Sequence, residues 1–235
     1  MKRAILTVIT GCLLATWGRA DDQMKVVIKD TFAVNEMRKA NDPLAGTVTE
    51  LGDRVWAGPA KTSPLFASDF RVVTNPEGDD PASNPDSVQW AYCPLDGLDG
   101  TTWSVKADLV SPEPDGGWVA VQFGSKSVWG AQLLFMVRND NVGVLYGEGN
   151  FTGLGSFNCP PNAGDVGEFR TLELVYDSTE NRVTCFCDGV MVFEKVLDFT
   201  PTMGDYAGFI LAGKSAGRAA TNFQVSVGSG SPAAK

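Results

Sequence analysis

Carboxylates are the residues of this chain that could carry out catalysis. The 235 residues include 28 Asp and Glu but no histidine. Without an imidazole, the sequence excludes a Ser-His-Asp triad, a Cys-His pair and imidazole ligation of a metal. Hydrolysis would therefore require two carboxyl groups on either side of the scissile bond, as in glycosidases.

Glu168 and Glu173 form the carboxylate pair with the most suggestive spacing, in the segment EFRTLE. Their offset of five is odd, so on a regular strand the two side chains point to opposite faces of the sheet. Both are therefore interpreted as solvated strand charges. The sequence predicts no catalytic residues and favours a non-enzymatic protein.

The cysteines leave two interpretations open. Cys185 and Cys187 share one face of a predicted strand, where they would serve as small core-facing hydrophobic side chains. Alternatively, one of them forms a disulfide with Cys93 or Cys159, although the sequence does not assign the pairing. The CxC spacing and the missing histidine argue against zinc.

Aromatic side chains in loops are the candidates for ligand binding, because sugars stack their apolar faces on such rings. Trp129 lies in the small-residue stretch GSKSVWG. Tyr146 and Phe151 border a glycine-rich loop, and Glu148 and Asn150 between them could bind hydroxyl groups. We predict these five residues as the ligand site, with the alternative that Trp129 only caps the core.

The charge of the chain limits its partners. Its formal net charge is −9, which repels phosphate backbones and disfavours nucleic acid. Acidic polysaccharides are disfavoured for the same reason. Neutral glycans and other proteins remain as expected partners.

Residues 1–20 are typical of a cleaved secretory signal. Lys2 and Arg3 precede an apolar run over 4–17, and 18–20 offers a small-residue cleavage site. The run is too short for a membrane span, which needs about 20 residues. We expect a secreted or periplasmic protein without a membrane span. The alternative is a lipid anchor on Cys12, which ends a lipobox-like sequence.

The remaining chain is predicted to be all-β. The segment 168–196 reads as a three-strand meander with turns at 177–181 and 188–189. Further strands are expected at 26–32, 55–57, 70–74, 88–93, 103–110, 118–123, 132–137, 142–146, 206–212 and 221–227. Long loops are expected at 75–87 and 147–167.

We predict one domain over 21–228, a two-sheet antiparallel β-sandwich, and a disordered tail over 229–235. Trp90, Trp103 and Trp118 lie in predicted strands and are expected to pack in the core.

A family resemblance follows from the strand and turn sequences. The segments that carry it are 30–32 with 56–57, 167–169, 172–177, 183–189, 207–209 and 222–225. They resemble the concanavalin A-like lectin/glucanase superfamily jelly roll, in the laminin-G-like form of bacterial exported domains. Cys185 and Cys187 depart from this pattern, because aliphatic or aromatic residues are more usual at those positions.

The resemblance implies a fold and several expectations about function. The glucanases of this superfamily carry Glu-x-Asp-x-x-Glu on one strand, and Arg170 takes the place of that Asp here. Sandwiches of this type often bind a structural calcium ion between their terminal strands, which makes Asp30 and Asn222 candidate ligands. No other cofactor is expected. We predict an exported non-catalytic module that binds a neutral glycan or cell-surface polymer. The alternatives are a carboxylate-dependent hydrolase and a structural interaction module of the envelope.

Overall fold

The computed structural model describes residues 24–36, 38–58, 65–68, 71–74, 88–110, 117–124, 130–147, 152–161, 168–203, 205–213 and 218–229. The predicted signal, Cys12 and the predicted loop 75–87 lie outside these ranges. The division into a signal, one domain and a tail therefore stays a prediction.

Fourteen strands make up the regular structure of the described residues: β1 (Met24–Asp30), β2 (Leu65–Ser68), β3 (Arg71–Thr74), β4 (Val88–Pro94), β5 (Thr102–Val110), β6 (Trp118–Phe123), β7 (Leu133–Arg138), β8 (Val142–Gly147), β9 (Thr152–Asn158), β10 (Arg170–Asp177), β11 (Arg182–Cys187), β12 (Val190–Val196), β13 (Tyr206–Ala212) and β14 (Ala219–Gly228). Within these residues, no helix has the length and apolar character needed to cross a membrane.

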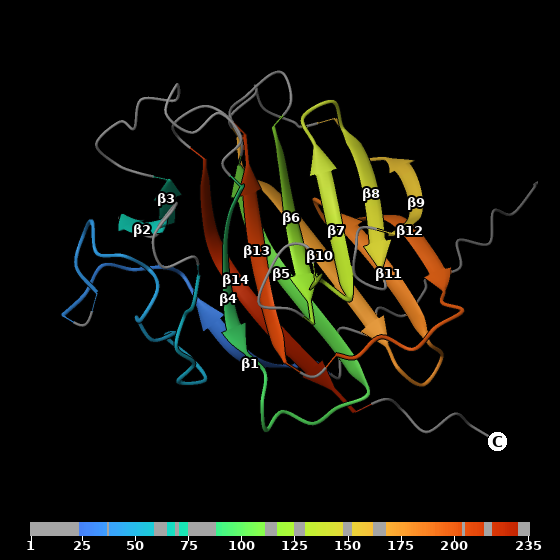
Figure 1. Ribbon diagram of the computed structural model, residues 1–235, viewed down its shortest axis with the longest axis horizontal. Coiled ribbons are helices and arrows are strands. Elements are labelled where there is room, and N and C mark those ends of the chain that lie inside the picture. The colour runs from blue at the N-terminus through green and yellow to red at the C-terminus, as the bar shows by residue number, and fades with distance from the viewer. Residues whose placement is uncertain are drawn as a thin grey trace, which may run out of the picture.

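Two antiparallel sheets are stacked face to face (Figure 1). In the described part of the chain, one sheet has eight strands in the order β12-β11-β10-β5-β14-β3-β2, with β1 also paired to β14. The other has six strands in the order β4-β13-β6-β7-β8-β9. The all-β sandwich predicted from the sequence is confirmed.

The predicted meander is confirmed as β10, β11 and β12, which pair in sequence order. Asp188 and Gly189 join β11 to β12 with φ angles of 52° and 77°. Two consecutive positive φ angles match the twist of a tight hairpin, and glycine adopts them without steric cost. Inward residues of β10 alternate with partly exposed ones, as the period of two predicts.

Two strand predictions are wrong. Residues 152–158 were expected in a loop, but they form β9 and pair with β8 at the edge of the six-stranded sheet. Residues 55–57 were expected as a strand, but they make only isolated bridges, from Val55 to Val48 and from Ala57 to Tyr92. The sequence also gave no sign of β2.

The core lies between the two sheets. Phe209 and Phe223 come from opposite sheets, and their ring centroids are 6.0 Å apart. Trp56 packs edge-on against both, at 5.7 Å and 4.9 Å. All four cysteines of the described chain are buried. Cys185 and Cys187 lie in the core cluster between the sheets, as the first interpretation expected, and the disulfide alternative stays a prediction.

A buried ion pair attaches the segment after β1 to this core. Asp30 is 0% exposed, and its carboxylate accepts hydrogen bonds from the Arg38 guanidinium at 2.7 Å and 2.6 Å. The Trp56 indole N–H donates to the same carboxylate at 2.7 Å, as does the Phe32 amide N–H at 2.7 Å. Burial of a carboxylate requires such full satisfaction.

Candidate functional site

The six-stranded sheet carries apolar side chains on both of its faces. Its inner face contributes to the core. On its outer face, which points away from the eight-stranded sheet, a second apolar cluster forms around Ala120, Leu134, Met136 and Ile210. Their exposed fractions are 0% to 8%. The outer side of this sheet is therefore partly enclosed, whereas antiparallel sheets commonly have one face exposed to solvent.

The tryptophan predictions are corrected by this arrangement. Trp90 and Trp118 were expected in the core, but they are partly buried side chains of the outer cluster. Of these three tryptophans, only Trp103 lies in the core between the sheets, where its indole N–H donates to the Gly100 carbonyl at 3.1 Å. Trp90 and Trp118 are partly exposed on the outer face.

A row of five residues crosses the outer face. Register places Tyr92 beside Gly208, Gly208 beside Gln122, Gln122 beside Leu134, and Leu134 beside Tyr146. Tyrosine rings thus stand at the two ends, and an amide side chain occupies the middle. Four strand spacings of about 4.8 Å separate the ends, or roughly 19 Å.

Gln122 is the unusual member of this row. Its side chain is 0% exposed, yet neither its amide oxygen nor its amide nitrogen has a hydrogen-bond partner among the described residues. An unpaired buried amide costs about 1–3 kcal/mol. An ordered water or a ligand that forms hydrogen bonds with this amide would remove that cost.

Further aromatic rings adjoin one end of the row. Trp90 lies two residues before Tyr92 on β4 and on the same face. Tyr92 packs edge-on against Tyr206, with ring centroids 5.1 Å apart. All three side chains are partly buried. Rings held in this way offer rigid apolar surface at low entropic cost.

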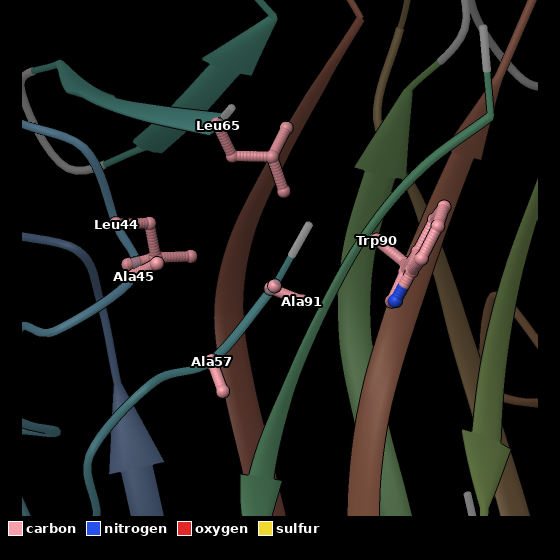
Figure 2. Close-up of a pocket in the computed structure, with 7 residues that line it drawn as sticks. Leu44, Ala45, Ala57, Leu65, Trp90 and Ala91 are labelled. Carbon is pink, nitrogen blue, oxygen red and sulfur yellow. The ribbon is translucent and has the colours of Figure 1, made fainter. Parts of the chain in front are cut away.

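A small pocket lies beside β4, between this strand and the segment after β1. Leu44, Ala57, Leu65 and Ala91 line it together with Trp90, whose ring projects on the far side of β4 from Leu44 and Leu65 (Figure 2). The cavity volume is about 10 Å³, which is room for one water molecule. This pocket is too small to hold a sugar, so the outer face of the six-stranded sheet is the better candidate.

The predicted ligand residues are placed only in part. Tyr146 lies on the outer face in the row with Gln122. Trp129, Glu148, Asn150 and Phe151 lie outside the described residues, so their role in binding stays a prediction.

The structure does not bring Asp30 and Asn222 together as ligands of a cation. Asp30 is buried and its two carboxylate oxygens accept hydrogen bonds from Arg38, Trp56 and Phe32. Asn222 is exposed, and its amide N–H donates to Asp108 at 2.7 Å. In the ladder between β1 and β14, Asp30 opposes Phe223, the residue after Asn222. Among the described residues, no group of three His, Cys, Asp or Glu is arranged to hold a metal ion.

The carboxylate pair weighed from the sequence lies far from the outer face of the six-stranded sheet. Glu173 belongs to β10 in the eight-stranded sheet and accepts a hydrogen bond from the Ser104 hydroxyl at 2.8 Å. Arg170 is buried and pairs with Asp188 at 3.2 Å. Glu168 precedes the strand and is exposed. In these contacts Glu173 and Arg170 act as hydrogen-bonding and ion-pairing side chains of the eight-stranded sheet.

Sequence reasoning missed Gln122, which it placed in the strand 118–123 without a role. A signal was present, because Gln122 is the only polar residue of WVAVQF. It alternates with Trp118 and Ala120, and this spacing puts the three on one face. The sequence could not show which face was the outer one.

Comparisons with known proteins support the fold. No family model matches the chain, and no curated protein matches it. Among solved structures, the carbohydrate recognition domain of Emp47p matches with a TM-score of 0.55 at 13% identity, over 90% of this chain and 100% of that one. A protein of unknown function with a galectin-like fold from Bacillus subtilis matches with a TM-score of 0.51 at 14% identity, over 74% of this chain and 90% of that one. The chain therefore has the concanavalin A-like lectin fold that its sequence resembles.

Proposed function

We propose that this chain is an exported, non-catalytic module that binds a neutral glycan or cell-surface polymer on the outer face of the six-stranded sheet. The observation that carries the proposal is the buried Gln122 side chain, whose amide has no partner among the described residues. An amide offers two donors and one acceptor oxygen. Sugar hydroxyl groups, which both donate and accept, are chemically matched to it.

The aromatic residues beside Gln122 fit the apolar side of a sugar. Tyr92 and Tyr146 stand at the ends of the row, and Trp90 adjoins Tyr92. Sugar rings present C–H faces that stack on aromatic rings while their hydroxyl groups bind polar side chains. The net charge of −9 disfavours acidic polymers, which leaves neutral ones as the better ligands.

Two further observations support the proposal. The carbohydrate recognition domain of Emp47p has the same fold, which makes a glycan a reasonable ligand class by analogy. The first 20 residues have the composition of a secretory signal, which would bring the module to extracellular or envelope polymers.

The test is a neutral glycan array probed with wild type and Gln122→Met. Methionine keeps the length of the side chain and removes its hydrogen bonds. A loss of about 1–3 kcal/mol of binding free energy predicts that the affinity for the bound glycan falls about 5- to 150-fold. Gln224→Met is the matched control, because Gln224 lies in β14 of the other sheet. Unchanged binding by Gln122→Met, or no binding of wild type to any glycan, would contradict the proposal.

Two more variants separate the other hypotheses. Trp129→Ala on the same array tests the predicted loop residue, and its effect would extend the site beyond the row. Release of reducing sugars from a polysaccharide panel tests the hydrolase alternative. Turnover that disappears in Glu173→Gln would replace the binding module with a carboxylate-dependent enzyme.

A further inference from the structure

Three of the buried cysteines gather at one end of the sandwich. Cys159 follows β9 of the six-stranded sheet, whereas Cys185 and Cys187 lie in β11 of the eight-stranded sheet. Cys159 and Cys187 belong to the same buried core cluster and interact through their side chains. The Cys187 thiol also donates to the Asp188 carboxylate at 3.6 Å.

Arg170 holds the residues next to both of these cysteines. Its guanidinium donates to the Pro160 carbonyl, directly after Cys159, and to the carboxylate of Asp188, directly after Cys187. It also donates to the Asn141 side chain at 2.7 Å. A single planar cation therefore binds the residues that follow Cys159 and Cys187, so the proximity of the two cysteines does not depend on their thiols alone.

From this geometry we propose that Cys159 and Cys187 form a disulfide that joins the two sheets. The sequence left the pairing open, and in the structure Arg170 binds the residues that directly follow Cys159 and Cys187. At the same end of the molecule, noncovalent contacts connect the sheet edges, such as the stacked rings of Phe157 and Phe193 at 4.8 Å and the hydrogen bond from Lys195 to the Leu154 carbonyl at 3.3 Å. The bond would add a covalent link where the edge strands β9 and β12 meet.

The roles of the two sulfur atoms differ. The hydrogen bond from Cys187, helped by the charge of Arg170, lowers the pKa of the Cys159 thiol despite its burial. The same hydrogen bond, together with burial, raises the pKa of the Cys187 thiol far above its usual range. Cys159 is therefore the nucleophile that first loses its proton.

The reaction is a thiol–disulfide exchange with a small or protein disulfide as oxidant. The Cys159 thiolate attacks one sulfur of that disulfide, forms a mixed disulfide and releases one thiolate. Cys187 then loses its proton and attacks the Cys159 sulfur, which releases the second thiolate. The two protein thiols lose two electrons and two protons in total, and the oxidant becomes two thiols.

The test maps disulfides in the purified full chain after equilibration with oxidised and reduced glutathione. Trypsin would release Cys159 in residues 139–170 and would release Cys185 and Cys187 together in 183–195. We expect these peptides to be linked. Because the second peptide holds two cysteines, Cys185→Ala is used to assign the partner, and the link should persist in that variant.

Thermal unfolding gives a second readout. The loop between the two cysteines predicts that oxidation raises Tm by roughly 7–14 °C in wild type and in Cys185→Ala. Cys187→Ala and Cys159→Ala should show no change in Tm on oxidation. Free thiols on both Cys159 and Cys187 in wild type after equilibration, or a link that disappears in Cys185→Ala, would overturn the proposal.

Discussion

Replacing Asp30 by asparagine should destabilise the fold strongly. The substitution removes the charge that pairs with Arg38, which is only 2% exposed. It leaves a buried cation uncompensated and weakens the hydrogen bonds from the Trp56 indole and the Phe32 amide. Breaking a buried ion pair by removing one partner typically costs about 3–5 kcal/mol of unfolding free energy. That amount is a large share of the stability of an ordinary domain.

Urea denaturation of the full chain, followed by tryptophan fluorescence, measures this loss. The transition midpoint should fall while the slope m stays constant, because the surface exposed on unfolding does not change. The control is Asp140→Asn, which breaks the pair of Arg138 and Asp140 with side chains 53% and 48% exposed. Such exposed pairs contribute about 0–1 kcal/mol. A loss below about 1 kcal/mol in Asp30→Asn would refute the reasoning.

Two further perturbations test local packing and titration. Gly208→Ala should destabilise the sandwich by about 1–3 kcal/mol, because its Cβ would lie 2.2 Å from the backbone oxygen of Ala91. Gly153→Ala meets nothing within 4 Å and should leave the urea midpoint unchanged or raised; equal losses in both variants would contradict the packing argument. Burial raises the pKa of Glu50, but hydrogen bonds from the Thr31 side chain and backbone outweigh it, so the net pKa lies below 4.5. A lowered folded pKa contributes stability above the unfolded value that is lost as pH falls below about 4.5. Urea midpoints between pH 6 and pH 3 should therefore decline less in Glu50→Gln than in wild type, and parallel curves would show that Glu50 makes no contribution.

The period-2 pattern was sufficient to predict most strands. It failed where a contact with a residue distant in sequence determines which residue type a strand position can hold. Strand β9 contains Gly153 and Gly155, which disfavour a strand in isolation. At Gly155, a Cβ would lie 2.5 Å from the ring of Phe193 in β12. The glycine is therefore required by a partner that is distant in sequence, and the local pattern alone cannot reveal it.

The candidate site was harder to predict for a related reason. In β6, both alternating sets of residues are largely apolar, so alternation could not tell the core face from the outer face. Trp118 and Gln122 were consequently not recognised as neighbours on the outer face. Tyr146 was predicted because a loop follows it, and its place in the row depends on pairing with Leu134 across strands.

The second apolar cluster has a consequence for how this protein could diversify. Side chains on the outer face, such as Ile210 and Met136, belong to a cluster separate from the core, although the residues between them on the same strands pack into the core. Because the two clusters are packed separately, we expect exchanges of outer residues around Gln122 to leave the alternate residues, and with them the core of the sandwich, in place.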